Sequence, residues 1–162
     1  MYLFLCRLCV VLLASFPLLS LVLLRFKLKS KILSVFPIHW DTQGVTSVIP
    51  EDNFYNMSLA ISVTTTMFAL LGITLDRKLG RATFWLLMIN SSVSAVASAM
   101  WISSAFAVLW IDDVYQAKLG LGVLIVPASF FYGMLPAFTW LKFVSAQKSC
   151  ADGKKREIQK QS

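Results

Sequence analysis

Charge is scarce in this chain of 162 residues, and residues 82–110 contain none at all. Only 14% of the residues are charged, against about 25% in a typical soluble domain. Hydrophobic residues make up 57% of the chain, and the mean hydropathy is +0.72. The scarcity excludes an ordinary soluble domain, and the composition indicates a single-domain integral membrane protein.

The groups that most enzymes use are also scarce. His39 is the only histidine, and no other metal ligand stands at a suitable spacing beside it. The sequence has no Ser-His-Asp set, no glycine-rich phosphate loop and no HExxH-type motif. We therefore expect no catalytic, cofactor-binding or metal site, and we expect that the protein is not an enzyme.

The net charge of +7 does not indicate nucleic-acid binding. The basic residues gather at the ends of hydrophobic segments and in the C-terminal tail, without a basic face interleaved with aromatic residues. Attraction to anionic lipid headgroups and orientation in a membrane explain the charge better. We expect the lipid bilayer to be the main partner, together with other membrane proteins or further copies of this chain.

Four hydrophobic segments are long enough to cross a bilayer, whose hydrocarbon core is about 30 Å thick. They cover about residues 8–24, 57–75, 82–110 and 119–144. Lipid offers no hydrogen bonds to the backbone, so each segment should be a helix. The predicted fold is all-α, a four-helix membrane bundle with short loops over residues 1–145, followed by a basic cytosolic tail at 146–162.

Orientation is predicted from lysine and arginine, which favour the cytosolic side. The link at 76–81 carries three of them, and the end of the fourth segment from Lys142 together with the tail carries six, whereas the link after the third segment has Asp112 and Asp113. Both termini should therefore be cytosolic, in the plasma membrane or the endomembrane system. Four basic residues just after the first segment oppose this assignment (Arg25, Lys27, Lys29 and Lys31).

A cleaved signal peptide at the N-terminus would leave the later topology unchanged. Its positive region would hold only Arg7, and no clean small-x-small cleavage site precedes the basic run. We favour a retained first span. The largest loop, at about 26–56, contains Pro37, Gly44 and Pro50, which predict an irregular chain with at most a short amphipathic piece.

Small residues recur every fourth position in the third segment and again in the fourth. Such ridges let helix backbones approach closely in lipid. We expect these two segments to cross through the two ridges, and we expect Trp101 to serve packing. The predicted packing residues are Ser91, Ala95, Ala99, Ser103 and Ala107, facing Ser129, Gly133 and Ala137.

The three cysteines lie near the predicted cytosolic side, where structural disulfides are rare. Juxtamembrane cysteines are candidates for palmitoylation, here Cys6, Cys9 and Cys150.

The architecture resembles that of MARVEL-type four-span proteins. The similar features are the short basic middle link, the longer first outer loop, the stretch 115–120 that enters the last span, and Ser98-Ala99-Met100-Trp101 in the third. The resemblance implies membrane apposition, microdomain organisation or vesicle trafficking without catalysis. The claudin-like group is a poorer match, because the outer loop has Trp40 but no cysteine pair.

Three functions are compatible with these features. The first is a non-enzymatic protein that organises or stabilises membrane partners or microdomains. The second is a small passive channel or transporter, which would need a water-lined path along Thr64–Thr66 and Ser91–Ser98. The absence of ionisable groups within the spans disfavours coupled transport. The third is an accessory subunit of a membrane enzyme complex.

Overall fold

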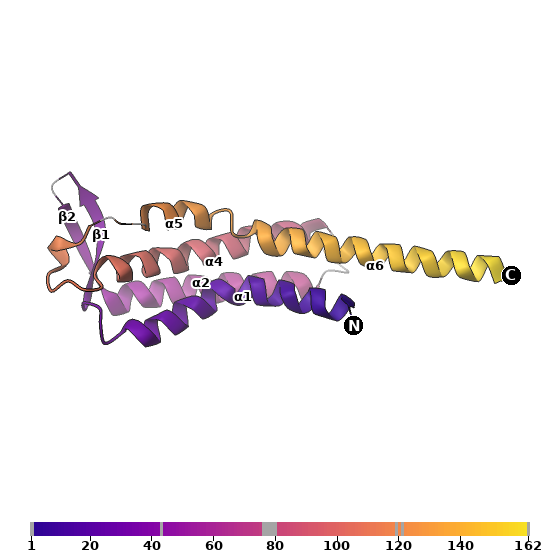
Figure 1. Ribbon diagram of the computed structural model, residues 1–162, viewed down its shortest axis with the longest axis horizontal. Coiled ribbons are helices and arrows are strands. Elements are labelled where there is room, and N and C mark those ends of the chain that lie inside the picture. The colour runs from indigo at the N-terminus through magenta and orange to yellow at the C-terminus, as the bar shows by residue number, and fades with distance from the viewer. Residues whose placement is uncertain (1, 43, 76–80, 119, 121, 162) are drawn as a thin grey trace.

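Long helices run side by side along most of the molecule, and a small β-hairpin covers one end of them (Figure 1). The structure is a computed structural model that describes residues 2–42, 44–75, 81–118, 120 and 122–161, with side chains except at 2, 3, 123 and 148–161. The elements, in chain order, are α1 (Tyr2–Leu28), β1 (Val35–Asp41), β2 (Gly44–Pro50), α2 (Glu51–Thr74), α4 (Arg81–Ala107), η1 (Val114–Gln116), α5 (Gly122–Ser129) and α6 (Met134–Gln161).

The helical character predicted from the sequence is confirmed. Four helical segments are long and apolar enough to cross a membrane: Phe4–Leu28, Glu51–Thr74, Arg81–Ala107 and Leu124–Gln147. The predicted limits need correction, because α1 and α2 reach further toward the hairpin than 8–24 and 57–75 do. Residues 108–110 leave the third helix, and Trp110 takes a φ of 96°, which is rare for a residue with a side chain.

The prediction of an irregular loop at 26–56 is wrong, and the mostly helical fold also contains a two-stranded sheet that was not predicted. Strands β1 and β2 form an antiparallel hairpin, with irregular register around His39. The stretch 45–49, in which every residue except Ser47 is β-branched, was the available signal. Pro37 is tolerated because a two-stranded sheet has only edge strands. Phe36 and Val45 anchor the hairpin by inserting into the core.

The fourth hydrophobic segment is interrupted. Helix α5 ends at Ser129, tight turns follow, and α6 begins at Met134 and continues to Gln161. Pro127 and Pro136, which lack backbone donors, flank this break. The predicted boundary between a fourth span and a separate tail at 146 does not appear in the backbone, because α6 passes through it without interruption.

The two ends of the bundle are formed by different parts of the chain. Both chain termini lie at one end, here called the terminal end, and the hairpin and η1 lie at the other, the hairpin end (Figure 1). One hydrophobic cluster fills each half. Trp101, Phe36 and Tyr55 belong to the cluster at the hairpin end, and Leu87 and Ala137 belong to the other.

Candidate functional site

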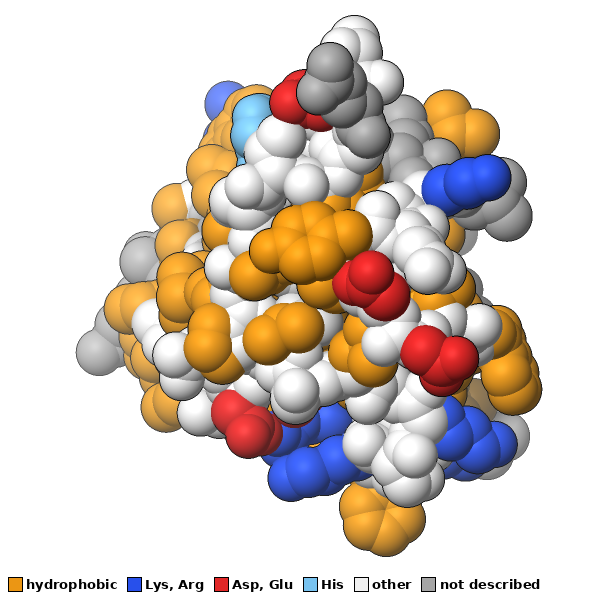
Figure 2. Space-filling view, turned by 90° about the vertical axis from the view of Figure 1, so that its left-hand side faces the viewer, with side chains coloured by type: hydrophobic (Ala, Val, Ile, Leu, Met, Phe, Trp, Pro, Cys, Tyr) orange, Lys and Arg blue, Asp and Glu red, His pale blue; other side chains and the backbone are white. Residues whose placement is uncertain are grey.

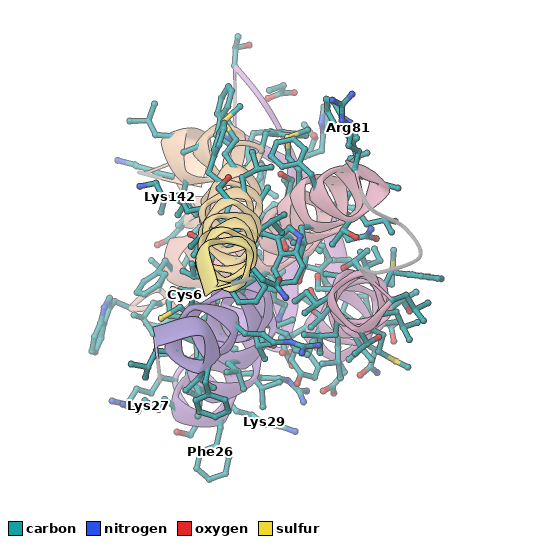
Figure 3. All side chains as sticks on the ribbon, turned by 90° about the vertical axis from the view of Figure 1, so that its right-hand side faces the viewer. Cys6, Phe26, Lys27, Lys29, Arg81 and Lys142 are labelled. Carbon is teal, nitrogen blue, oxygen red and sulfur yellow. The ribbon has the colours of Figure 1, made fainter. Side chains whose placement is uncertain are left out.

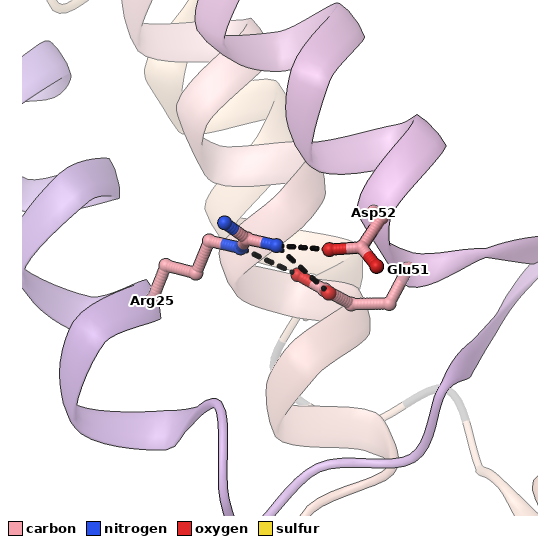
Figure 4. Close-up of polar contacts among 3 residues, drawn as sticks. All are labelled: Arg25, Glu51 and Asp52. Atoms are coloured by element: carbon pink, nitrogen blue, oxygen red, sulfur yellow. Dashed lines mark hydrogen bonds and ion pairs between the residues drawn. The ribbon is translucent and has the colours of Figure 1, made fainter.

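An arginine at the end of α1 is tied to the start of α2. Arg25 donates from Nε to Glu51 Oε1 at 3.0 Å and from Nη2 to Glu51 Oε2 at 3.3 Å, and Nη2 also pairs with Asp52 (Figure 4). Its guanidinium carbon lies 3.8 Å from the centre of the Tyr55 ring, a cation–π contact. The cluster joins the two ends of the hairpin segment, because Arg25 precedes β1 and Glu51 follows β2.

This pairing distinguishes Arg25 from the other basic residues beside it. Lys27 and Lys29 point away from the bundle, as does Phe26, whose side chain is 88% exposed (Figure 3). The acidic partners of Arg25 stand in the first turn of α2, where the helix dipole also favours negative charge. One of the four basic residues that opposed the predicted orientation is therefore compensated within the fold.

An aromatic group lies directly beneath this cluster. Trp101 of α4 is fully buried, with its ring 5.8 Å from that of Tyr55 and 5.8 Å from that of Phe36, and Phe36 meets Phe54 edge-on at 6.3 Å. Trp101 thus packs α4 against both α2 and the hairpin, as the packing interpretation predicts. Its indole nitrogen is buried and has no hydrogen-bond partner among the described atoms.

A cavity of about 450 Å³, here called the hairpin cavity, lies beside this aromatic group. The residues that line it include Pro37 and Trp40 of β1, Phe54 of α2, Ser103 and Ala107 of α4, and Gly122 and Pro127 of α5.

The side chains around the hairpin cavity are held by the fold. The indole N–H of Trp40 donates to the Ala117 carbonyl oxygen at 3.3 Å, which fixes one wall. Helices α4 and α5 approach each other closely at Ser103 and Gly122, which both line the cavity. A Cβ atom at Gly122 would lie 2.7 Å from the Cβ of Ser103, so this approach requires glycine. The Ser103 Oγ is buried there and has no partner among the described atoms.

A second cavity of about 620 Å³ shares Ser103, Ala107 and Gly122 with the first. Its lining adds Gln116 and Lys118, so it is the more polar of the two. Residues of α5 therefore line both cavities.

The predicted packing ridges are divided between the core and the cavities. In α4, Ser91, Ala95 and Ala99 are buried inside the bundle. Ser103 and Ala107, further along the same ridge, are only half-buried, and both line the cavities.

The ridge of the fourth segment meets α4 beside the predicted positions. Gly133 approaches the Met88 carbonyl and Ser92, neither of which was predicted. Ala137 packs in the cluster that contains Leu87. The Ser129 hydroxyl donates to the carbonyl of Ile125 in its own helix at 2.7 Å.

The packing between α2 and α4 is the most extensive between helices, and it was not predicted from the sequence. Hydroxyls face one another there: Ser62 Oγ lies 3.2 Å from Ser98 Oγ, and Thr66 Oγ1 lies 3.4 Å from Ser94 Oγ. All four residues are buried. The four-residue spacing of Ser58, Ser62 and Thr66 was a signal for this interface.

The side-chain amide of Asn90 donates to the Leu86 carbonyl of its own helix at 2.9 Å. The predicted cysteines and the histidine are placed as follows. Cys6 is half-buried and Cys9 exposed near the start of α1, and both are free thiols, while the Cys150 side chain lies outside the described part. His39 is exposed on β1, and the described residues contain no group of three or more side chains that could hold a metal ion.

The hairpin cavity and the Arg25 cluster thus both lie at the hairpin end. Comparisons of the chain with protein-family models, with curated proteins and with solved structures gave no match.

Proposed function

We propose that this chain is a four-span membrane protein that organises or stabilises membrane partners or microdomains, without catalysis of its own. One observation carries the proposal: four buried hydroxyls of α2 and α4 bond to one another inside the bundle, while large apolar side chains cover its outside. Phe16, Phe68 and Phe138 are each more than half exposed on different helices, as expected of a surface solvated by lipid.

The paired hydroxyls favour this role over a passive channel. Ser62, Thr66, Ser94 and Ser98 would line a water path, but each is at most 4% exposed and bonds across the α2–α4 interface. Thr64 faces outward on α2. A pore through this face would have to break these contacts, whereas a scaffold uses them for cohesion.

We propose further that both termini face the cytosol. Ten lysine and arginine residues belong to the terminal end or the links and tail that adjoin it, and five belong to the hairpin end. Pairing of Arg25 with Glu51 and Asp52 lessens the conflict at the hairpin end. The hairpin would then face the outside of the cell or the lumen of an organelle.

The hairpin end is the proposed surface for partners. Hydrophobic side chains lie at its centre, with acidic and basic ones around them (Figure 2). Trp110 and Tyr115 are 85% and 62% exposed there, and Trp110 is held in a strained backbone conformation. Exposed aromatic residues with a charged rim are typical of protein interfaces. A MARVEL-like role in membrane apposition or trafficking is compatible with such a surface.

A photocrosslinking experiment tests the organising role. The photoreactive residue p-benzoylphenylalanine replaces Tyr115 at the hairpin end or, as a matched control, the lipid-facing Phe68. After irradiation of intact membranes, we expect position 115 to give one discrete protein adduct and position 68 to give lipid adducts. Identical lipid adducts at both positions, together with solute flux through purified protein in liposomes, would overturn the proposal in favour of a channel.

A further inference from the structure

We propose that the hairpin cavity binds a single molecule of a rigid, uncharged lipid with one hydroxyl group, of the sterol class, and that this hydroxyl bonds to Ser103. The inference goes beyond the organising role, because it assigns a small-molecule site to the chain itself.

The lining selects an uncharged, largely apolar ligand. A volume of about 450 Å³ lies within the range of small-molecule sites, about 300–1,000 Å³. None of the described residues that line it is charged, so a phosphate headgroup would find no counter-ion inside. Water gains few hydrogen bonds against such a wall, whereas an apolar ligand fills it favourably.

The Ser103 hydroxyl supplies the polar contact. Its Oγ is buried without a partner among the described atoms, and a buried hydroxyl without a hydrogen bond is unfavourable. Ser103 lines the hairpin cavity, and the proposed bond requires a χ1 rotamer that turns its Oγ toward the cavity. A hydroxyl both donates and accepts, so one ligand hydroxyl satisfies this group.

The depth of Ser103 matches the position of a sterol in a bilayer. Ser103 lies four residues before the end of α4 at Ala107, which is about 6 Å along the helix axis. In the proposed four-span arrangement, on which this step rests, a hydroxyl bonded there lies near the membrane surface. Met100, one turn deeper on α4, and Pro127 on α5 line the part of the cavity that would hold the apolar body.

The walls favour a rigid occupant over a flexible acyl chain. Trp40 is held by its bond to the Ala117 carbonyl, Phe54 packs edge-on against Phe36, and Pro127 has no rotamer freedom. A rigid ligand and fixed cavity walls lose little conformational entropy on association, whereas a flexible acyl chain would lose many rotamers.

The test uses the full chain in liposomes of phosphatidylcholine with a photoreactive, alkyne-bearing sterol. We expect labelled peptides from β1, α4 or α5, and competition by unlabelled sterol but not by dioleoylglycerol. Ser103→Ala should weaken sterol binding by about three- to tenfold without unfolding the protein, because it removes only the unpaired hydroxyl. Ala107→Leu should abolish the labelling by filling the cavity.

Ala60→Leu is the matched control for the second variant, because Ala60 is exposed on α2 outside the lining of this cavity. Equal labelling of A107L and wild-type protein, competition by dioleoylglycerol as strong as by sterol, or labelled peptides only from α1 or α6 would each overturn the proposal. Ser103→Ala keeps the test valid if A107L fails to fold. Loss of sterol labelling with the Tyr115 crosslink retained would separate this site from the organising role.

Discussion

Ser92 on α4 occupies the break in the fourth hydrophobic segment: its Oγ accepts a hydrogen bond from the backbone N–H of Gly133 at 3.1 Å. The same hydroxyl donates to the Phe130 carbonyl at 2.7 Å. One side chain thus satisfies a donor and an acceptor that the interrupted helix leaves free. An interrupted helix is tolerated within a membrane only where neighbouring groups supply such bonds.

Replacing Ser92 by alanine should therefore destabilise the protein by about 1–3 kcal/mol, because lipid around this break would offer the two backbone groups no other partner. Ser129→Ala is the matched control, because the Ser129 hydroxyl bonds only within its own helix in the described contacts. Thermal unfolding in mild detergent measures both. Equal unfolding temperatures for the two variants would contradict the bridging role of Ser92.

Gly133 should tolerate no side chain. A Cβ atom there would overlap the Met88 carbonyl oxygen and lie 2.5 Å from Ser92 Oγ, so Gly133→Ala must push α4 and α6 apart. We expect a loss of about 1–3 kcal/mol, as for other overpacked sites, and more for leucine. Gly120→Ala is the control, since a Cβ at Gly120 meets nothing within 4 Å. Gel filtration and thermal unfolding should show a defect only at 133.

Removing the charge of Arg25 should leave Glu51 buried without its partner. The side chains of Arg25 and Glu51 are 17% and 7% exposed, so the pair is only weakly screened by water. Breaking a buried pair on one side costs about 3–5 kcal/mol. We expect Arg25→Gln to destabilise the fold strongly and Lys29→Gln to have little effect.

The double variant R25Q/E51Q should recover much of that stability, because the uncompensated carboxylate is gone. A double-mutant cycle from denaturant unfolding measures the coupling between the two residues. If the effects of R25Q and E51Q simply add, the ion pair does not stabilise the fold.

Accessibility labelling should reveal the orientation in the membrane. In a variant without the native cysteines, Thr46→Cys at the hairpin end should react with an impermeant maleimide on the non-cytosolic side. Ser162→Cys at the chain terminus should react only after the membrane is made permeable. Labelling of both positions from one side would refute the four-span topology, and labelling of residue 162 alone would reverse its orientation.

Much of the helical frame is predictable from local composition. Long apolar runs specify membrane-competent helices because lipid leaves the backbone no other partner, which holds for the segments around Leu21, Ala69 and Trp101 alike. The small residues at 133 and 137 also predict close helix packing, but they do not predict which residues they contact. The role of the basic residues after the first segment could not be predicted from the sequence, because the acidic partners of Arg25 lie on another helix.

The amino-acid sequence by itself determined that this chain forms four apolar helical segments with most of its basic residues near one end. Only the tertiary structure decided that Arg25 meets Glu51, that Ser92 bridges the break beside Gly133, and that a hairpin closes over a cavity next to Ser103. The physical reason is that hydropathy acts residue by residue along the chain. Hydrogen bonds, ion pairs and cavities depend on groups that are brought together from distant segments, 26 positions apart for Arg25 and Glu51 and 41 for Ser92 and Gly133.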